Sequence, residues 1–323
     1  MKRERQSGIR YLKTERDIGA EMGTIIRCPI RLFDLQGLGI DQERFLMDLA
    51  PSFHELAWDP YDARRERVQF LLDRFPEEQV RLEQFRETYY REGDAALEDV
   101  RDLLRRLAWS ERYRFDKLRS YRRRSIASFV VTNRFSATWE DQWHVKRTRI
   151  EGFAQDVEED DSRSLVRVFD ETSVKVVENI GFQRLLVAVA EMVEDAEAEF
   201  DLEPGEMELT FHQMSLPARP GEEVSNAPEG RHKDGADYIV SALVVERSNI
   251  AGGVSVVTSD DPQRVLLEHT LQPGEGLFQA DVNSSLWHDV TPARLLDIES
   301  SEVGVRNIFG FDIVVTRRVP RER

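Results

Sequence analysis

The sequence is poor in cysteine and has no long apolar segment. Cys28 is the only cysteine among 323 residues, so an intramolecular disulfide is excluded and a reducing compartment is expected. No run of about 18 apolar residues occurs, which argues against a membrane-spanning helix. Residues 1–8 carry basic side chains without an apolar segment behind them and do not have the pattern of a secretory signal. We therefore expect a cytoplasmic protein in which Cys28 is a small buried residue.

Basic residues are also in short supply. Lys and Arg number 45 against 61 Asp and Glu, which gives a formal net charge of −16. A chain of this sign is poorly suited to general nucleic-acid binding, because that binding depends on Lys and Arg neutralising phosphates. The exception is the arginine-rich segment 119–124, which we interpret as a solvated or ion-paired face rather than a binding patch. We expect neither nucleic acid nor membrane among the partners.

Helical and β patterns occupy different parts of the chain. Apolar residues at helical spacing predict helices from residue 41, over 61–75, 77–92 and 94–109, and again over 179–200. Segments with β-type composition predict strands over 125–132, 164–169, 208–214, 238–246, 254–258, 264–270, 276–281, 285–289 and 303–316. Many short strands separated by Gly, Pro and Asn turns are typical of a double-sheet jelly roll.

The predicted fold class is therefore α+β, with a jelly-roll core (a double-stranded β-helix) and a helical N-terminal elaboration. We expect residues 1–120 to form a mainly helical region that packs on the core, and residues 121–323 to form the jelly-roll domain.

One stretch has the residues of a metal centre. His232 and Asp234 are two positions apart, so in an extended segment their side chains point to the same face. His288, on a later predicted strand, can supply a third ligand. Two histidines and one carboxylate on one face of a metal form the facial triad of non-haem Fe(II) oxygenases. His-x-Asp alone is weak evidence, so this interpretation depends on its place at the start of a strand. We interpret His54 and His144 as structural or surface residues.

Arg306 lies in an apolar β-type run and supports the same interpretation. An arginine on a core strand costs free energy if it has no partner. An iron site of this kind needs two electrons from a co-substrate, commonly 2-oxoglutarate, whose far carboxylate requires a planar bidentate partner such as arginine. We favour this role for Arg306 over a structural ion pair.

The chain resembles the 2-oxoglutarate/Fe(II) dioxygenase family that includes bacterial L-isoleucine 4-hydroxylases. Four blocks carry the resemblance in order and spacing: Pro228-Glu-Gly-Arg-His-Lys-Asp-Gly-Ala-Asp237, Glu246-Arg-Ser-Asn-Ile-Ala-Gly-Gly-Val-Ser255, Trp287-His-Asp-Val-Thr-Pro292 and Gly304-Val-Arg306. The resemblance covers residues 205–317 well and residues 120–200 loosely.

The resemblance implies a jelly-roll core in which His232, Asp234 and His288 bind Fe(II). It also implies that Arg306 binds 2-oxoglutarate, with O2 as the other co-substrate. Halogenating relatives lack the carboxylate, so Asp234 favours hydroxylation, with desaturation or ring closure as other outcomes. The chain departs from the family after Arg306, where Asn307 and residues 310–312 replace a more apolar strand.

The substrate that the resemblance implies is a free amino acid or a small amino-acid derivative. Such a substrate needs an acid for its ammonium group and a base for its carboxylate. Glu229, Arg231 and Asp237 lie close to the metal ligands in sequence and are our candidates, although each can equally be an exposed loop residue. The N-terminal helices can shape a lid, cover the sheet or make a homodimer.

Two other classes of function stay open. One is a peptide or protein hydroxylase, or a demethylase, on the same fold. Nucleic-acid repair relatives carry a second arginine about six residues after the clamp, where this chain has Asp312. The other is a cupin-like metal isomerase or binding protein, which would not need O2 or 2-oxoglutarate.

Overall fold

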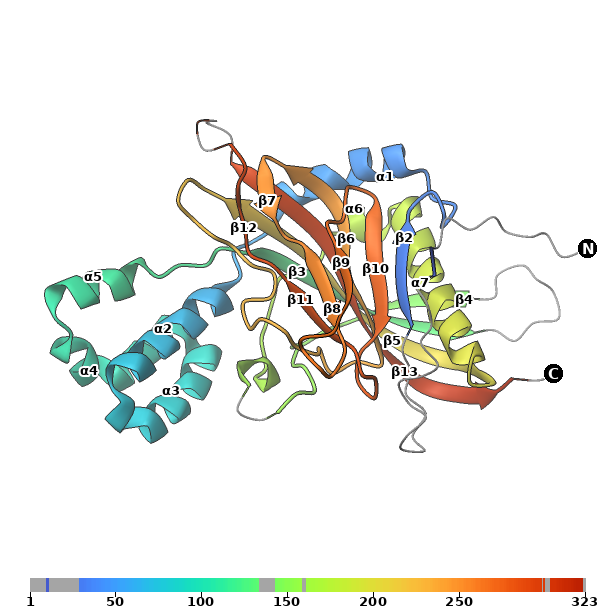
Figure 1. Ribbon diagram of the computed structural model, residues 1–323. Coiled ribbons are helices and arrows are strands. Elements are labelled where there is room, and N and C mark those ends of the chain that lie inside the picture. Colours follow the sequence, from blue (N-terminus) through green and yellow to red (C-terminus); the bar gives the residue numbers. More distant parts are fainter. Residues whose placement is uncertain are drawn as a thin grey trace, which may run out of the picture.

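The framework of the molecule is one large antiparallel sheet, and two smaller sheets lie beside it (Figure 1). A computed structural model describes residues 10–11, 29–133, 143–158, 161–297, 299 and 303–321. Cys28 lies outside the described residues, so its expected burial stays a prediction.

The large sheet has eight strands, in the order β1-β2-β10-β6-β13-β5-β3-β4. Their bounds in that order are β1 Arg10–Tyr11, β2 Ile30–Asp34, β10 Glu275–Ala280, β6 Tyr238–Ser248, β13 Gly304–Pro320, β5 Leu202–Ala218, β3 Arg123–Asn133 and β4 Trp143–Thr148. The smaller sheets are β11-β8-β9 and β12-β7, with bounds β11 Trp287–Val290, β8 Ser255–Thr258, β9 Val265–His269, β12 Ala293–Leu295 and β7 Ile250–Gly252.

The helices precede most of the sheet in sequence. They are α1 Gln42–Leu49, α2 Pro60–Arg74, α3 Gln79–Glu92, α4 Arg101–Arg106, α5 Trp109–Lys117, α6 Val174–Val177 and α7 Ile180–Ala198, with 3-10 turns at Ala50–Glu55, Pro76–Glu78, Gly93–Val100 and Ser162–Ser164. None of the described helices combines the length and the apolar character that crossing a bilayer requires. The α+β fold class with antiparallel sheets is confirmed.

The main core lies between the large sheet and helix α7. Asn179 starts this helix by accepting a hydrogen bond from the Phe182 backbone N–H. Phe182 is fully buried, and its ring packs edge-on against those of Phe211 on β5 and Phe309 on β13. Phe45 of α1 meets the Phe309 ring from another side, at 6.0 Å between ring centroids. This packing fixes β5 and β13, which frame the site described below.

Helices α2 to α5 form a separate lobe that projects away from the sheets (Figure 1). Its buried residues make a cluster of their own: Val68, Leu71, Phe75, Leu82, Phe85, Tyr89, Ala96, Val100, Leu103, Leu104, Leu107 and Phe115. The lobe is joined to the sheet by a buried ion pair, in which Arg122 donates to Asp62 at 2.7 Å and to Asp59 at 3.4 Å. The division of the chain at residue 120 and a homodimer through these helices stay predictions.

Sequence-based predictions of secondary structure are wrong over 94–109 and 164–169. The helix predicted over 94–109 is interrupted, because Leu107 is extended and Glu111 caps the backbone N–H of Ala108 to begin α5. The strand predicted over 164–169 makes only one bridge, with Phe153. In that segment the apolar Val166 and Val168 are exposed while Arg167 is buried, which is the reverse of the burial that its alternation predicted.

Candidate active site

His232 and His288 lie side by side as an isolated antiparallel bridge. The His232 N–H donates to the His288 carbonyl at 2.9 Å, and the His288 N–H donates back at 3.1 Å. The sequence predicted that His232 and Asp234 open a strand, and this was wrong, because β6 begins only at Tyr238. Gly235 turns the chain with a φ of 86°, so the carboxylate is carried by a loop rather than by a strand.

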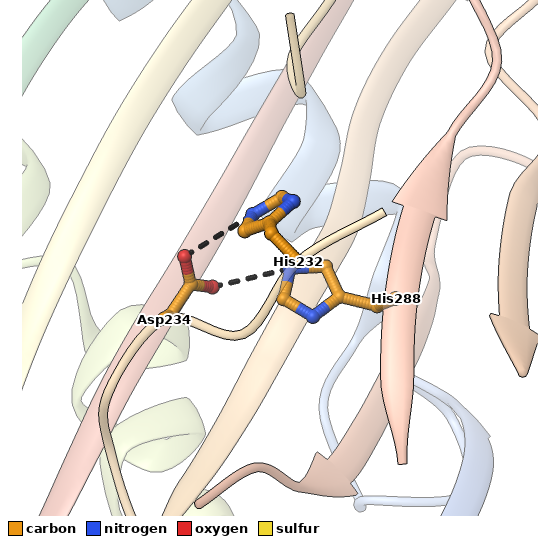
Figure 2. A group of neighbouring side chains, drawn as sticks. All are labelled: His232, Asp234 and His288. Atoms are coloured by element: carbon orange, nitrogen blue, oxygen red, sulfur yellow. Dashed lines mark ion pairs between the residues drawn. The ribbon is translucent and has the colours of Figure 1, made fainter. Parts of the chain in front are cut away.

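Asp234 faces both imidazoles from one side, and the two rings lie next to each other at 4.1 Å between centroids (Figure 2). One of its oxygens is 3.3 Å from His232 Nε2, and the other is 3.3 Å from His288 Nε2. One donor atom from each residue lies within 4.8 Å of the others. Neighbouring ligands at about 2.1 Å from a metal are about 3 Å apart, so the three side chains can hold one divalent ion with little movement.

The hydrogen bond of the His232 imidazole favours metal binding, whereas Nδ1 of His288 is buried without a hydrogen-bond partner. His232 Nδ1 donates to the Gly230 carbonyl at 2.7 Å, which leaves the Nε2 lone pair facing Asp234. Burial by itself lowers the pKa of His232, but the hydrogen bond and charge of Asp234 outweigh burial and raise that pKa to about 9. The carboxylate that faces both imidazoles therefore attracts positive charge, whether a proton or a metal ion supplies it.

Arg306 is fully buried on β13 and has no carboxylate within 4.0 Å among the described residues. Its Nη1 donates to the side-chain oxygen of Asn226, while Nε and Nη2 have no hydrogen-bond partner. Arg247 Nη1 is likewise buried without a partner, and both side chains border Gly253, where a Cβ would lie 3.0 Å from Arg306 Cδ. Burial and the charge of Arg247 lower the pKa of Arg306 to about 9. These free donors fit a carboxylate supplied by a ligand.

The triad opens into a cavity of about 100 Å³. The helical lobe contributes Tyr61, Asp62 and Arg65 from α2 and Tyr90 from α3. The lobe therefore borders the cavity. Of the three roles considered for the N-terminal helices, a lid over the pocket is compatible with this position, and it stays a prediction.

The three candidate substrate residues have different surroundings. Glu229 lines the cavity, 3.3 Å from His232 Nε2. Arg231 instead donates to Thr258 and to the Ser259 carbonyl. Asp237 accepts from the Val315 N–H at 2.8 Å and pairs with an arginine of β13 at 2.9 Å. The structure therefore brings Glu229 to the site, whereas Arg231 and Asp237 attach the loop before β6 to β8 and β13.

Sequence reasoning missed several residues of the cavity. Arg122 and Arg124 were expected on a solvated or ion-paired face. Arg122, just before β3, is ion-paired but buried, and Arg124 on β3 is buried without a carboxylate partner; both line the cavity. Arg167, His212 and Asp312 also line it. The sequence feature that could have identified them is a charged or imidazole side chain inside a β-type run, because such a side chain is costly to bury unless it has a partner.

A comparison with protein-family models locates the chain among known proteins. Residues 109–312, more than half of the chain, match a family model described as 2OG-Fe dioxygenase. The comparison with curated proteins gave no match.

Several solved structures match part of the chain at low sequence identity. A bsmA homolog from Methylobium petroleophilum PM1 is 20% identical, with a TM-score of 0.49 over 60% of this chain and 72% of that one. IDO from Bacillus thuringiensis is 14% identical, with a TM-score of 0.47 over 61% and 79%. The Fe(II)/(alpha)ketoglutarate-dependent dioxygenase TqaL is 14% identical, with a TM-score of 0.43 over 80% and 97%.

Proposed function

The chain belongs to the 2OG-Fe dioxygenase family, an enzyme family that uses Fe(II) and 2-oxoglutarate, and from this premise we propose that it hydroxylates a free amino acid or a small amino-acid derivative. The observation that carries the proposal is the pairing of a His-Asp-His cluster with a buried arginine that lacks an anionic partner.

In this proposal His232, Asp234 and His288 hold Fe(II). Three ligands from one side would leave other positions of the ion open for co-substrates. Asp234 also supplies a negative charge that partly neutralises the metal. Asp281 and Gln155 hold this loop in place, because Gln155 donates to Asp234 Oδ1 at 2.6 Å and Asp281 accepts from the Asp234 N–H at 2.9 Å.

Arg306 binds the far carboxylate of 2-oxoglutarate. Its two unsatisfied nitrogens and Arg247 Nη1 supply donors where a carboxylate needs them, and Asn226 holds the guanidinium from the other side. When bound, Fe(II) and 2-oxoglutarate supply the oxidising chemistry, in which one atom of O2 enters succinate as CO2 leaves and the other enters a substrate C–H bond.

The dimensions and charges of the cavity favour a small polar substrate. A space of about 100 Å³ is below the range of about 300–1,000 Å³ that is usual for drug-sized ligands. A peptide or a flipped nucleobase would need a wider opening, and the charge of −16 disfavours nucleic acid. The polar lining, which includes Glu229 and several arginines, is suited to a molecule with charges of both signs.

The test is succinate release across the free amino acids, with Fe(II), 2-oxoglutarate and O2. We expect one amino acid or a close group to accelerate succinate release and to gain one oxygen atom, and omission of O2 to stop both. Product formation without O2 or 2-oxoglutarate would point to an isomerase. Turnover only with peptides or proteins would point to a protein hydroxylase.

A further inference from the structure

Five arginines line the cavity that holds the triad, and they differ in their partners. Three are paired with carboxylates: Arg122 with Asp62 at 2.7 Å, Arg163 with Asp161 at 2.7 Å and Arg65 with Glu66 at 3.0 Å. Arg124 and Arg167 have no carboxylate within 4.0 Å in the part of the chain that the structure describes. Two cations of the site therefore lack the counter-ion that the other three possess.

Both unpaired arginines are deeply buried. The exposed fraction is 8% for Arg124 and 7% for Arg167, and neither Nε has a hydrogen-bond partner. The Arg124 guanidinium lies 4.5 Å from the Phe169 ring centroid, and the Arg167 guanidinium lies 5.1 Å from that of Phe153. Stacking on rings uses the faces of the guanidinium groups. On their edges Arg167 Nη2 donates to the Gln155 side chain at 3.1 Å and Arg124 Nη2 to His212 at 2.8 Å, so each group keeps its Nε without a partner and makes only neutral hydrogen bonds. Because buried charges without an anion are costly, the pair fits an anionic group of a ligand.

The cavity also contains one carboxylate outside the triad without a basic partner. Among the described residues, Asp312 has no lysine or arginine within 4.0 Å, and its contact is with His212 at 3.1 Å. Arg124 lies 2.8 Å from His212 Nδ1, and because arginine can only donate, Nδ1 must be the acceptor. The proton of the neutral imidazole is then on Nε2 and is donated to Asp312. His212 thus holds Asp312 in place without supplying a positive charge. Burial and the charge of Asp234 raise the pKa of Asp312 to about 8, and an ammonium group beside it would favour the ionised carboxylate.

We propose that Arg124 and Arg167 bind the α-carboxylate of the substrate and that Asp312 binds its α-ammonium group. A single imidazole separates Arg124 from Asp312, with contacts of 2.8 and 3.1 Å on its two sides, so one α-amino acid can bridge the two charges with its own hydrogen bonds. The inference rests on the proposed function and assigns to it the recognition of an unmodified α-amino acid. A residue inside a peptide carries neither charge and does not satisfy this site.

The subsite is separate from the one for 2-oxoglutarate. Arg306 sits on β13 with Asn226 and Arg247 near its guanidinium, whereas Arg124 comes from β3 and stacks on Phe169. Each arginine can therefore serve its own carboxylate, and the two roles can be measured independently.

The experiment compares the amino acid that best stimulates succinate release with two neutralised forms, its carboxamide and its N-acetyl derivative. For the wild type we expect kcat/KM to fall by at least about 30-fold for each derivative. Arg124→Gln keeps a donor toward His212 and should raise the KM for the amino acid by about 30-fold while changing the KM for the carboxamide little. Arg167→Gln should act in the same way, and Asp312→Asn should instead lose the discrimination against the N-acetyl form.

A binding measurement separates recognition from turnover. Calorimetric titration of Mn(II)-loaded protein gives dissociation constants for 2-oxoglutarate and then for the amino acid. We expect Arg124→Gln to weaken binding of the amino acid and Arg306→Gln to weaken binding of 2-oxoglutarate. Arg119→Gln, a control at an exposed position, should weaken binding of neither. Arg124→Lys, which keeps the charge without the planar fork, should restore part of the affinity.

The outcomes distinguish the inference from the proposed function. Equal use of the amino acid and its carboxamide by the wild type would overturn the inference while leaving hydroxylation intact, and this comparison needs no variant to fold. An Arg124→Gln variant that loses affinity for 2-oxoglutarate, and not for the amino acid, would also overturn the inference. Amino-acid binding that depends on Arg124 but gives no hydroxylated product would support the subsite and contradict the proposed function.

Discussion

The carboxylate of Asp281 accepts three backbone hydrogen bonds from the loop that carries Asp234. Its Oδ2 lies 2.9 Å from the Asp234 nitrogen, 2.8 Å from the Gly235 nitrogen and 3.1 Å from the Ala236 nitrogen. Asp281 is fully buried and follows β10 in the chain, so this side chain ties the loop to the end of a strand of the large sheet. The position of the Asp234 carboxylate thus depends on a residue that does not itself face the two histidines.

We predict that Asp281→Asn lowers the affinity for divalent metal by about 10–100-fold, because an amide oxygen accepts these hydrogen bonds less strongly. Mn(II) titration followed by electron paramagnetic resonance measures the change. Glu268→Gln, an exposed carboxylate on the neighbouring β9, is the matched control and should leave the affinity as it is. Equal affinity in wild type and Asp281→Asn would show that the loop holds its shape without this residue.

Removal of a triad side chain should remove the metal. We predict that His232→Ala retains no stoichiometric iron after desalting and gives none of the visible charge-transfer absorption expected when Fe(II) and 2-oxoglutarate are added anaerobically. His144→Ala is the control, since His144 is exposed on β4. Iron bound by His232→Ala at wild-type level would mean that other residues form the metal site.

Arg306→Gln should impair 2-oxoglutarate binding without destabilising the ligand-free protein. Loss of a buried charge partner costs at least about 2 kcal/mol, so we expect the KM for 2-oxoglutarate to rise by about 30-fold or more. Removal of a buried charge that has no carboxylate partner should leave the melting temperature unchanged or raised. Thermal melting with and without 2-oxoglutarate measures both effects, because a ligand stabilises only a protein that binds it. Arg294→Gln, exposed on β12, is the control.

Arg122 should be essential for docking of the helical lobe. In Arg122→Met the carboxylates of Asp59 and Asp62, which are 1% and 2% exposed, stay buried without a cation. We predict a loss of about 3–5 kcal/mol in the free energy of unfolding, measured by urea denaturation. Arg119→Gln breaks an exposed pair with Glu222 and should change stability by less than about 0.5 kcal/mol. Similar stability of the two variants would contradict a structural role for the buried pair.

Gly235 should tolerate no side chain. Its φ is 86°, and a Cβ would lie 2.4 Å from the Asp156 carbonyl oxygen. We predict that Gly235→Ala displaces the Asp234 loop and lowers metal affinity more than 10-fold, by the same Mn(II) titration. Gly221→Ala is the matched control, since Gly221 has a φ of 75° but no atom within 4 Å of the added Cβ. A Gly235→Ala variant with normal metal affinity would indicate that residue 156 moves aside readily.

The sequence by itself determined the fold class and the types of residue in the proposed metal site. Alternating apolar residues and turn signals are local properties, and for that reason they predicted most strands of the jelly roll. The His232-x-Asp234 spacing and the apolar run around Arg306 are also local, and both drew attention to residues that the structure places in a buried, polar setting.

Only the tertiary structure decided which charged residues surround that centre. Arg124, Arg167 and Asp312 come from three distant segments, and no spacing in the sequence connects them. The sequence-based interpretation of segment 119–124 as a solvated or ion-paired face missed the buried cavity position of Arg124, because charge along a chain carries no information about which face of a sheet becomes covered. Burial is decided by the elements that pack on a strand, and these lie elsewhere in the chain.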